Sequence, residues 1–456
     1  MGVLLLCLLV YGGNTYYVAN GGSNGSTGTS LGNAWETLQY AANNVTAGDT
    51  VLVADGTYAG FELFTSGSPG SPITFMAMAD NAVINTGDNV RGDLINVENA
   101  DYVVVDGFVV TGAGRAGIAV LGLPTDHVLF VTIRNCVCVD NFRWGIFTGY
   151  AEDVLIENNT CSGADDEHGI YVSNSADRPI IRDNVVFDNV ASGIQINADP
   201  ALPGDGIISN AHILRNIIYN NGTAGGGSIN LASVRDSLIA NNLVYDNLNT
   251  GIAMWDDGFD PAFGCKNNLV ANNTVIMAPG GRWASSLSNG STGNTFRNNI
   301  LLHRGTRGGL EIDASSKVGL DTDFNVIHRI SDLDNWILLP EWQMQGYDAN
   351  SLDALPPALF VNEASDDYHL SDTSPARDAG TNLAEVLDDL EGNARPVGVT
   401  TDIGSYEYGG TPPQCGTGLG PYFENWLLAP QPPNALDVNL NGWIDIADAV
   451  TMVNCL

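Results

Sequence analysis

Basic residues are scarce in this sequence. Only 17 of the 456 residues are Lys or Arg, against 52 Asp or Glu, which gives a formal net charge of −35. There are just two lysines, Lys266 and Lys317. A nucleic-acid-binding protein needs a basic face for the phosphate backbone, so the composition excludes this class. The acidic excess favours a soluble, extracellular protein and is compatible with bound calcium.

Long apolar runs are missing as well. No stretch approaches the roughly 20 residues that a membrane-spanning helix needs, so we expect no membrane span. Residues 3–10 (VLLLCLLV) are similar to the apolar core of a signal peptide, although no positive segment precedes them and no clean cleavage site follows. A buried first strand is the alternative. We therefore predict a signal-like segment at residues 1–13 and a secreted protein.

The seven cysteines are too few for a dense disulfide framework in a chain of this length. Cys138 and Cys161 fall at matching places of consecutive repeats, so they either stack or form a bridge. Cys415 and Cys455 bracket the C-terminal segment and could close it, whereas Cys265 has no obvious partner.

The middle of the chain repeats itself. An apolar residue is followed by a short Asn-rich stretch, and the third residues of these phrases are 135, 158, 183, 241, 272 and 298. Residues 214–216 (LRN) fit between them, and most gaps are 23 to 33 residues. Apolar residues alternate over short runs bounded by Asn, Asp and Gly, which is typical of strands. Short strands at this period predict a β-solenoid with one Asn column along its length.

A second landmark, Gly-Ile, sets the register between repeats. Aligning it stacks one strand of each coil into a parallel sheet, with Ile146, Ile170, Ile194, Ile229 and Ile252 pointing inward. Alternation then points the residues between them outward. The predicted outward stripe consists of Phe147, Tyr171, Gln195 and Asn230, followed by Ser173, Asn197 and Trp255.

These ladders resemble the right-handed parallel β-helix of pectate-lyase-like proteins. The opening segments, residues 16–23 (YYVANGGS), 35–42 (WETLQYAA) and 47–58 (AGDTVLVADGTY), resemble the first strand, capping helix and first coil of secreted β-helix polysaccharide lyases. Residues 374–380 and 402–408 resemble the closing segment of similar proteins. The resemblance implies an all-β right-handed parallel β-helix over residues 14–408. The fold hosts lyases, epimerases, hydrolases and non-enzymatic proteins, so it does not fix the reaction.

The tail carries a calcium-loop pattern after a linker at residues 409–420. Oxygen donors stand at loop positions 1, 3, 5, 9 and 12, with Gly442 at the sharp turn. The predicted Ca²⁺ ligands are Asp437, Asn439, Asn441, Trp443 through its carbonyl, Asp445 and Asp448. Residues 421–456 resemble a dockerin, the α-helical EF-hand-like module that docks onto a cohesin-type scaffold protein. Dockerins usually carry two such loops and only one is found, so a plain calcium-stabilised tail is the alternative.

One dense polar cluster, residues 164–171 (ADDEHGIY), lies beside the outward stripe. On the repeat alignment Arg143 lies level with Glu167, and Trp144 with His168. We predict catalytic roles for His168, Tyr171, Lys266 and Arg143. The predicted substrate-binding residues are Trp144, Gln195, Asn197, Trp255, Arg282 and Trp283, and Asp165, Asp166 and Glu167 form a possible second calcium site.

This combination suits a uronate polymer. Trp and Tyr offer flat faces to sugar rings, and Arg143, Arg282 or calcium can neutralise the substrate carboxylate, which acidifies the C5 proton for a nearby base. We therefore expect a monomeric polysaccharide lyase acting by β-elimination on an acidic polysaccharide. The alternatives are a non-catalytic glycan-binding or adhesion β-helix, a hydrolase using two carboxylates, and a C5-epimerase. Each polar residue has a structural interpretation too: a solvated turn for residues 165–167, ladder packing for Tyr171 and a surface lysine for Lys266.

Overall fold

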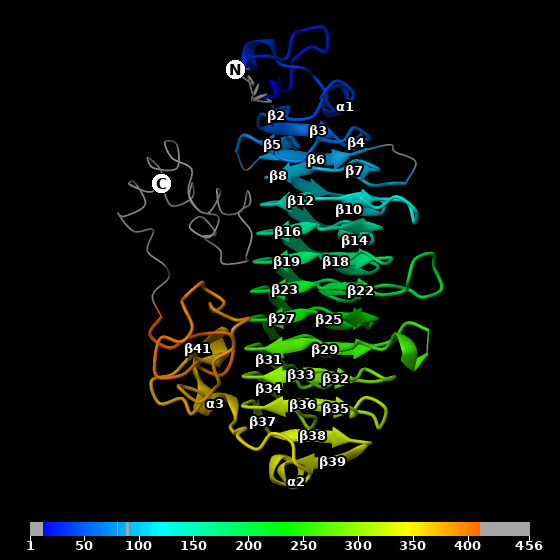
Figure 1. Ribbon diagram of the computed structural model, residues 1–456. Coiled ribbons are helices and arrows are strands. Elements are labelled where there is room, and N and C mark those ends of the chain that lie inside the picture. Colours follow the sequence, from blue (N-terminus) through cyan, green and yellow to red (C-terminus); the bar gives the residue numbers. More distant parts are fainter. Residues whose placement is uncertain (1–11, 80, 88–90, 259, 411–456) are drawn as a thin grey trace, which may run out of the picture.

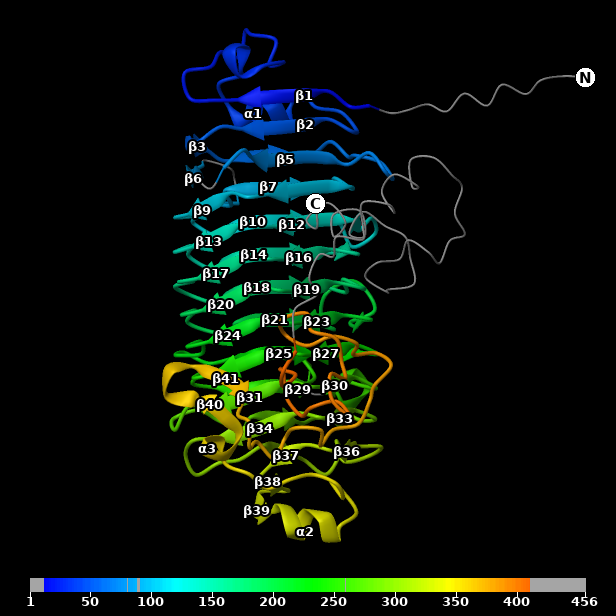
Figure 2. The ribbon, with the colours of Figure 1, turned by 90° about the vertical axis from the view of Figure 1, so that its left-hand side faces the viewer.

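The chain winds into a parallel β-helix, as the repeat predicts. The computed structural model describes residues 12–79, 81–87, 91–258 and 260–410. Three long parallel sheets run side by side along one solenoid, and each coil contributes a strand to each sheet (Figures 1 and 2). No helix in these ranges is long and apolar enough to cross a membrane.

Sheet A is the first of the three long sheets and contains 12 strands. Its strands are β1 (Thr15–Val18), β2 (Thr50–Val53), β5 (Ile73–Ala77), β8 (Val103–Asp106), β12 (Val131–Arg134), β16 (Leu155–Glu157), β19 (Ile180–Arg182), β23 (His212–Leu214), β27 (Leu238–Ala240), β30 (Leu269–Ala271), β33 (Thr295–Arg297) and β36 (Asp321–Asp323).

Sheet B follows sheet A in each coil and contains 11 strands. Its strands are β3 (Gly56–Ala59), β6 (Ala82–Thr86), β9 (Val109–Thr111), β13 (Val137–Val139), β17 (Thr160–Ser162), β20 (Val185–Phe187), β24 (Ile217–Tyr219), β28 (Leu243–Tyr245), β31 (Thr274–Met277), β34 (Ile300–His303) and β37 (Val326–Ile327).

Sheet C completes the coil and contains 12 strands, of which the last pairs antiparallel. Its strands are β4 (Phe61–Leu63), β7 (Ile95–Glu98), β10 (Ala116–Leu121), β14 (Trp144–Gly149), β18 (His168–Ser173), β21 (Ile194–Asn197), β25 (Gly227–Ala232), β29 (Thr250–Trp255), β32 (Ser285–Leu287), β35 (Leu310–Ile312), β38 (Arg329–Asp332) and β39 (Asn335–Leu338).

Short elements decorate the coils and close the two ends. Three two-stranded sheets pair β11 (Val128–Leu129) with β15 (Ala151–Glu152), β22 (Ile208–Ser209) with β26 (Val234–Arg235), and β40 (Phe360–Asn362) with β41 (Asp367–Leu370). Helix α1 (Leu38–Ala42) lies at the first end and α2 (Leu339–Met344) at the other, while α3 (Pro356–Leu359) follows α2 in the chain (Figure 1). Single 3₁₀ turns lie at Leu31–Asn33, Pro261–Phe263 and Glu363–Ser365.

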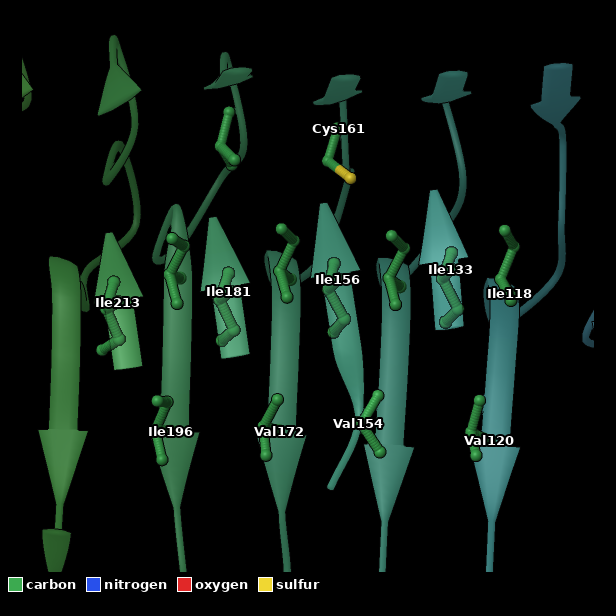
Figure 3. Packing of buried hydrophobic residues seen from close by; sticks show 14 of the residues in the cluster. Ile118, Val120, Ile133, Val154, Ile156, Cys161, Val172, Ile181, Ile196 and Ile213 are labelled. Carbon is green, nitrogen blue, oxygen red and sulfur yellow. The ribbon is translucent and has the colours of Figure 1, made fainter. Parts of the chain in front are cut away.

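The predicted register of sheet C is confirmed. Ile146 pairs with Ile170, Ile170 with Ile194, and the series continues through Ile229 and Ile252. All five side chains are fully buried and belong to one continuous core. Figure 3 shows neighbouring members of this core stacked in columns from coil to coil. Burying such a side chain stabilises the fold by about 1.5–3 kcal/mol, so the columns supply most of the cohesion.

The asparagine column is confirmed too, and it extends further than predicted. In successive coils the column consists of Asn159, Asn184, Asn216, Asn242, Asn273, Asn299 and Asn325, and each member after Asn159 accepts a hydrogen bond from the side-chain amide nitrogen of the member before it. The same amide groups donate to backbone carbonyls such as that of Ile133, so no buried amide is left unpaired in this column. A second such column, Asn189, Asn221 and Asn247, follows sheet B.

The doubled asparagines of the repeat have different roles. The residue before each ladder Asn has a positive φ, for example 54° at Asn158 and 56° at Asn241. Asn tolerates this left-handed conformation better than most residues because its short side chain can bond locally. The first Asn of each pair therefore makes the turn, and the second joins the coils.

The cysteines stack and do not bridge. Cys138 pairs with Cys161 across neighbouring strands of sheet B. Both are free and buried, as are Cys136 and Cys265. Burial raises the pKa of Cys265 to about 11, so its thiol stays protonated at neutral pH and packs as a small apolar group. Cys415 and Cys455 lie outside the described residues.

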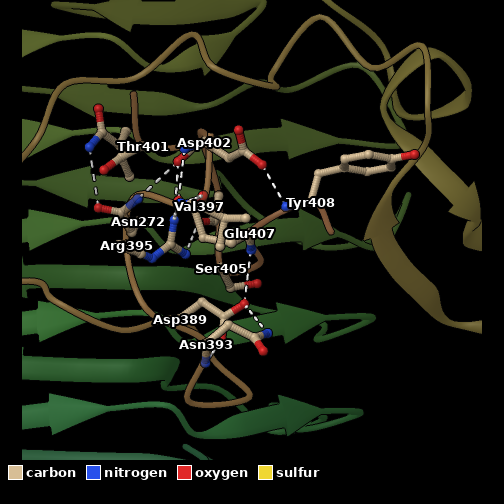
Figure 4. A network of polar contacts seen from close by, with 12 residues as sticks. Asn272, Asp389, Asn393, Arg395, Val397, Thr401, Asp402, Ser405, Glu407 and Tyr408 are labelled. Atoms are coloured by element: carbon tan, nitrogen blue, oxygen red, sulfur yellow. Dashed lines mark hydrogen bonds and ion pairs between the residues drawn. The ribbon is translucent and has the colours of Figure 1, made fainter. Parts of the chain in front are cut away.

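After α2 the chain turns back and covers the side of the solenoid (Figures 1 and 2). Asn298 and Asn272, each preceding a ladder position, bond to the backbone of Thr381 and Asp402 in this returning segment. At its centre the buried guanidinium of Arg395 pairs with Glu407 at 2.9 Å and donates to the Gly404 carbonyl (Figure 4). The predicted domain 14–408 therefore contains coils up to β39 and then a packed strap.

We predict that Asn216→Ala destabilises the coils. The side chain of Asn216 donates to the Ile181 carbonyl and to Asn242, and accepts from Asn184, all within the buried column. Loss of these bonds leaves buried partners unpaired and should lower the free energy of unfolding by about 2–3 kcal/mol. Urea unfolding followed by tryptophan fluorescence measures the change. The exposed Asn335→Ala is the control, and equal midpoints for the two variants would contradict the role of the column.

Candidate functional site

The outward face of sheet C carries the predicted polar stripe. Phe147, Tyr171, Gln195 and Asn230 occupy equivalent positions in four consecutive strands, β14, β18, β21 and β25. The inward neighbours are core isoleucines, so the alternation of the strands fixes which side chains reach the surface. The structure thus brings most of the predicted site residues together on one face.

Arg143 is held by acidic side chains of the next coil. Its guanidinium pairs with Asp166 at 3.3 Å and with Glu167. The other oxygen of Glu167 accepts a hydrogen bond of 2.8 Å from the indole nitrogen of Trp144. The alignment of Arg143 with Glu167 is therefore confirmed, but the positive charge of Arg143 is already compensated within the protein.

Trp144 does not have the exposure of a sugar platform. Its side chain is buried, stacks on Phe147 with ring centroids 4.2 Å apart, and lies beneath Arg143 at 4.7 Å. Arg115 lies 5.4 Å from the Phe147 ring on the same cluster. These contacts occupy the ring faces, so the aromatic pair supports the wall of the site instead of offering a free surface.

The residues proposed for a second calcium do not form a ready-made site. Asp166 and Glu167 both bind Arg143, and Asp165 is exposed. In the described ranges no group of three or more His, Cys, Asp or Glu side chains is arranged to hold a metal ion. The six ligands of the predicted tail loop, residues 437–448, lie outside the described residues.

His168 is a neutral imidazole with one nitrogen occupied. Its Nδ1 accepts a hydrogen bond of 3.0 Å from the backbone N–H of Ser192. Burial, together with the nearby charge of Arg143, lowers the pKa of His168 to about 3. The neutral ring then carries its proton on Nε2, which lies 3.7 Å from Glu167 Oε2. This geometry makes His168 a hydrogen-bond donor and does not suit the role of general base.

Tyr171 lies next to His168 with its hydroxyl protonated. The two rings meet edge to face at 5.2 Å between centroids. Burial raises the pKa of Tyr171 above its ordinary value, the carboxylates of Glu167 and Asp257 raise it further, and a hydrogen bond with Asn197 lowers it only in part. A phenol in this state can donate a proton to a bound ligand.

A row of hydrogen-bonded polar groups continues from Tyr171 across three coils. Asn230 donates to Gln195 Oε1 at 2.7 Å, and the Trp255 indole nitrogen donates to Asn230 Oδ1 at 3.0 Å. The Ser192 hydroxyl also reaches Gln195 Oε1, at 3.2 Å. These bonds order the polar surface formed by Tyr171, Gln195, Asn230 and Trp255, of which Gln195 and Asn230 are largely buried, and they leave the Gln195 amide nitrogen without a partner among the described residues.

Asp257 borders this polar surface. Its Oδ2 accepts a hydrogen bond of 2.8 Å from Asn197, and its charge acts on Tyr171. Asp257 follows β29 closely, and neither Asp257 nor Ser192 is among the predicted site residues. Asp257 follows the repeated positions of its coil and Ser192 precedes those of its own coil. The repeat alone therefore does not predict which side chains they contact.

Two predicted residue groups lie elsewhere. The backbone of Lys266 forms a β-bridge with that of Arg235, at the end of the short β22–β26 sheet. The Lys266 ammonium donates to the Ala262 carbonyl at 3.1 Å. None of its contacts belongs to the cluster around Tyr171. Arg282 and Trp283 precede β32, four strands beyond β18 in sheet C, which is about 19 Å along the solenoid. Lys266, Arg282 and Trp283 therefore lie apart from the cluster around Tyr171, and Lys266 stands in the column of Arg235 as its place in the repeat predicts.

Comparisons with known proteins agree with this architecture. Residues 78–202 match a family described as "Right handed beta helix region". The structure of the pectate lyase Pel9A superposes with a TM-score of 0.60 at 18% identity, covering 86% of this chain and 96% of that one. The chain is a right-handed parallel β-helix, and its fold is similar to that of Pel9A.

Two further matches complete the comparison. YwoF, an uncharacterized protein of Bacillus subtilis (strain 168), is 25% identical over 459 residues, which covers 80% of this chain and 92% of the relative. The complex of XylC with xylose superposes with a TM-score of 0.47 at 11% identity, covering 68% of this chain and 83% of that one. Neither match shows a function, which therefore has to be argued from the residues of the site.

We predict that His168 makes the protein acid-sensitive. The unfolded chain protonates this imidazole near pH 6.5, as an unperturbed His does, whereas the folded protein protonates it near pH 3. The free energy of unfolding therefore falls as the pH is lowered from 6.5 toward 3. His168→Gln removes this pH-dependent contribution to the free energy of unfolding. The variant should therefore lose about 1–2 kcal/mol less stability between pH 7 and 5.

Urea unfolding at pH 7 and pH 5 measures the stability that each variant loses on acidification. His369→Gln is the control, because its effect on this loss should be opposite to that of His168→Gln. Partial burial lowers the pKa of His369, but its bonds to Asp367 and Glu391 raise it overall. Removing His369 should therefore increase the stability lost on acidification. A His168→Gln variant with the same pH dependence as the unmodified protein would show that His168 is not held neutral.

Proposed function

We propose that the protein acts on a polysaccharide containing uronate residues and cleaves it by β-elimination. The observation that carries this proposal is the juxtaposition on sheet C of a protonated Tyr171, the Nε2–H of a neutral His168 and an acidic side chain, Asp257, around one polar surface. These are a proton donor, a hydrogen-bond donor and a candidate base within one cluster.

The chemistry assigns a role to each group. Hydrogen bonds from His168 Nε2–H and the Gln195 amide to the uronate carboxylate would acidify the C5 proton by stabilising the developing enolate. The Asp257 carboxylate takes that proton, because its Oδ1 makes no bond to another described residue. The electron pair forms the C4–C5 double bond, the C4–O bond breaks, and the leaving oxygen takes the proton of Tyr171. Atoms and charge balance without a further reactant.

A non-catalytic glycan-binding protein is the second candidate, and a specific observation favours it. Arg143 forms ion pairs with Asp166 and Glu167. The unprotonated nitrogen of His168, Nδ1, accepts the hydrogen bond from the backbone N–H of Ser192. Neither a free cation nor a free imidazole base is therefore left in the cluster for catalysis. In this alternative the same polar surface holds the polymer without turnover.

We predict that Tyr171→Phe abolishes most of the elimination activity. Loss of a positioned acid costs about 10²–10⁴-fold in kcat, with little change in KM, because the ring and its contacts remain. Absorbance of the unsaturated uronate product, followed on pectic, alginate, ulvan and glycosaminoglycan polymers, measures the rate. Asp257→Asn should be equally slow, and Tyr219→Phe, in the stacked ladder of sheet B, is the matched control.

The outcomes separate the candidates. Unsaturated product that is lost in Tyr171→Phe and Asp257→Asn supports the lyase. New reducing ends without unsaturation would show hydrolysis instead. Tight binding of a polymer with a flat absorbance trace would overturn the lyase in favour of the glycan-binding alternative.

We further propose that the protein is secreted and that the tail loop binds Ca²⁺ and docks onto a cohesin-type partner. The support is the spacing of oxygen donors at residues 437–448. Calorimetric titration of the full chain with CaCl₂ should show one site, lost in Asp437→Ala and in Asp448→Ala and kept in the control Asp165→Ala. Unchanged titration curves in both loop variants would contradict the tail site.

A further inference from the structure

Three arginines without carboxylate partners gather at the far end of sheet C. Across the described part of the chain, most arginines form ion pairs between coils, as Arg134 does with Asp106 and Arg182 with Glu157. Within the same residues Arg282, Arg307 and Arg329 form none, as do Arg235 and Arg377 elsewhere in the chain. In a chain with a net charge of −35, an uncompensated positive cluster is the exception.

The backbone holds two of these arginines in place. Arg307 donates from Nη1 to the Gly281 carbonyl at 2.6 Å, and Arg329 donates to the Thr306 carbonyl. Both lie close to His303, whose pKa is lowered by burial and also by the charges of Arg307 and Arg329. The two guanidiniums therefore lie in the same neighbourhood with their positive charge intact.

An exposed tryptophan adjoins the arginines. Trp336 on β39 pairs with Ser331, which pairs with Glu311, so all three stand in the outward column that also contains Tyr171. The Trp336 side chain is 53% exposed, meets the buried Trp283 edge to face at 5.5 Å, and lies under Arg329 at 6.0 Å. Trp283 fixes one edge of this ring and leaves surface open to a ligand.

The arginines also line a cavity. A hollow of about 440 Å³ lies beside β34, with Arg304, Arg307 and Arg329 in its wall. Glu363 and Asp246 compensate Arg304, and Asp353 bonds His328. The charges that remain uncompensated on the wall are those of Arg307 and Arg329. The volume lies in the range of small-ligand sites.

Glu311 does not compensate the whole cluster. The charges of Arg282 and Arg307 act on its carboxylate, but one negative charge cannot balance three guanidiniums. Gathering like charges costs free energy unless an anion joins them, and the planar guanidinium fork matches a carboxylate. The arrangement is thus complementary to an anionic group carried next to a flat apolar face.

We propose that Arg307, Arg329 and Trp336 form a distal subsite that binds one uronate residue of the polymer, the arginines holding its carboxylate and Trp336 its ring face. The identity of the polymer rests on the proposed function. β35 lies five strands beyond β18, which is about 24 Å along the solenoid. The subsite therefore anchors the polymer at a distance from Tyr171 and takes no part in the chemistry.

Calorimetric titration with oligogalacturonate and oligoguluronate tests the subsite on the full chain. The double variant Arg307→Gln/Arg329→Gln should weaken binding about 10- to 100-fold, since charge-assisted hydrogen bonds are lost. Trp336→Ala, at an exposed position, should weaken binding about 10-fold and leave the fold intact. Arg235→Gln is the matched control, because Arg235 also lacks a carboxylate partner among the described residues and donates to a backbone carbonyl.

The results distinguish this inference from the proposed function. Weaker binding in the double variant and in Trp336→Ala, together with unchanged kcat on saturating polymer, supports the subsite. Normal binding in both variants of a protein that still cleaves or binds the polymer would overturn the subsite and leave the function standing. Equal affinity for sulfated neutral oligosaccharides would overturn the assignment to a carboxylate. An unmodified protein that neither binds nor cleaves any uronate polymer would overturn both.

Discussion

The structure depends on hydrogen bonds that run from coil to coil through its interior. Each Asn of the main column before Asn325 donates to the Asn of the next coil and to a backbone carbonyl of the preceding one, as Asn184 does. A parallel solenoid turns sharply at every corner, and the polar groups at a buried turn need partners because an unpaired one costs about 1–3 kcal/mol. The asparagine column supplies hydrogen-bond partners to these polar groups in the same way in every coil. A further coil with an Asn at this position therefore needs no other polar side chain there.

The use of charge follows from the same stacking. Arginines are few, and most of those in the described ranges form ion pairs, many of them with an acidic side chain of the neighbouring coil, as Arg215 does with Asp183. Even Arg143, beside the candidate active site, forms ion pairs with two carboxylates. Arg282, Arg307 and Arg329 differ from the paired majority because they lie near one another without an ion pair, and an anionic ligand would balance their charge.

In the candidate site, the periodicity of the sequence predicts which residues lie level in neighbouring strands but not how their side chains are buried or bonded. The alignment of Gly-Ile phrases correctly placed Arg143 beside Glu167 and Tyr171 beside Gln195, because strands in a solenoid keep their register. It could not show that Trp144 is covered by its own neighbours or that Ser192 occupies the lone pair of His168. Burial and hydrogen bonding depend on side-chain packing between coils and on irregular loops, which a repeat does not encode.

The sequence by itself determined the fold class, the inward and outward faces of sheet C and the asparagine column, because each follows from a short-range pattern repeated along one axis. The tertiary structure decided which residues meet across irregular segments. It separated Lys266 and Arg282 from Tyr171, laid the strap after α2 along the solenoid, and brought Arg307, Arg329 and Trp336 to one place. Those contacts join residues whose spacing in the sequence has no period, so only the path of the chain through space could reveal them.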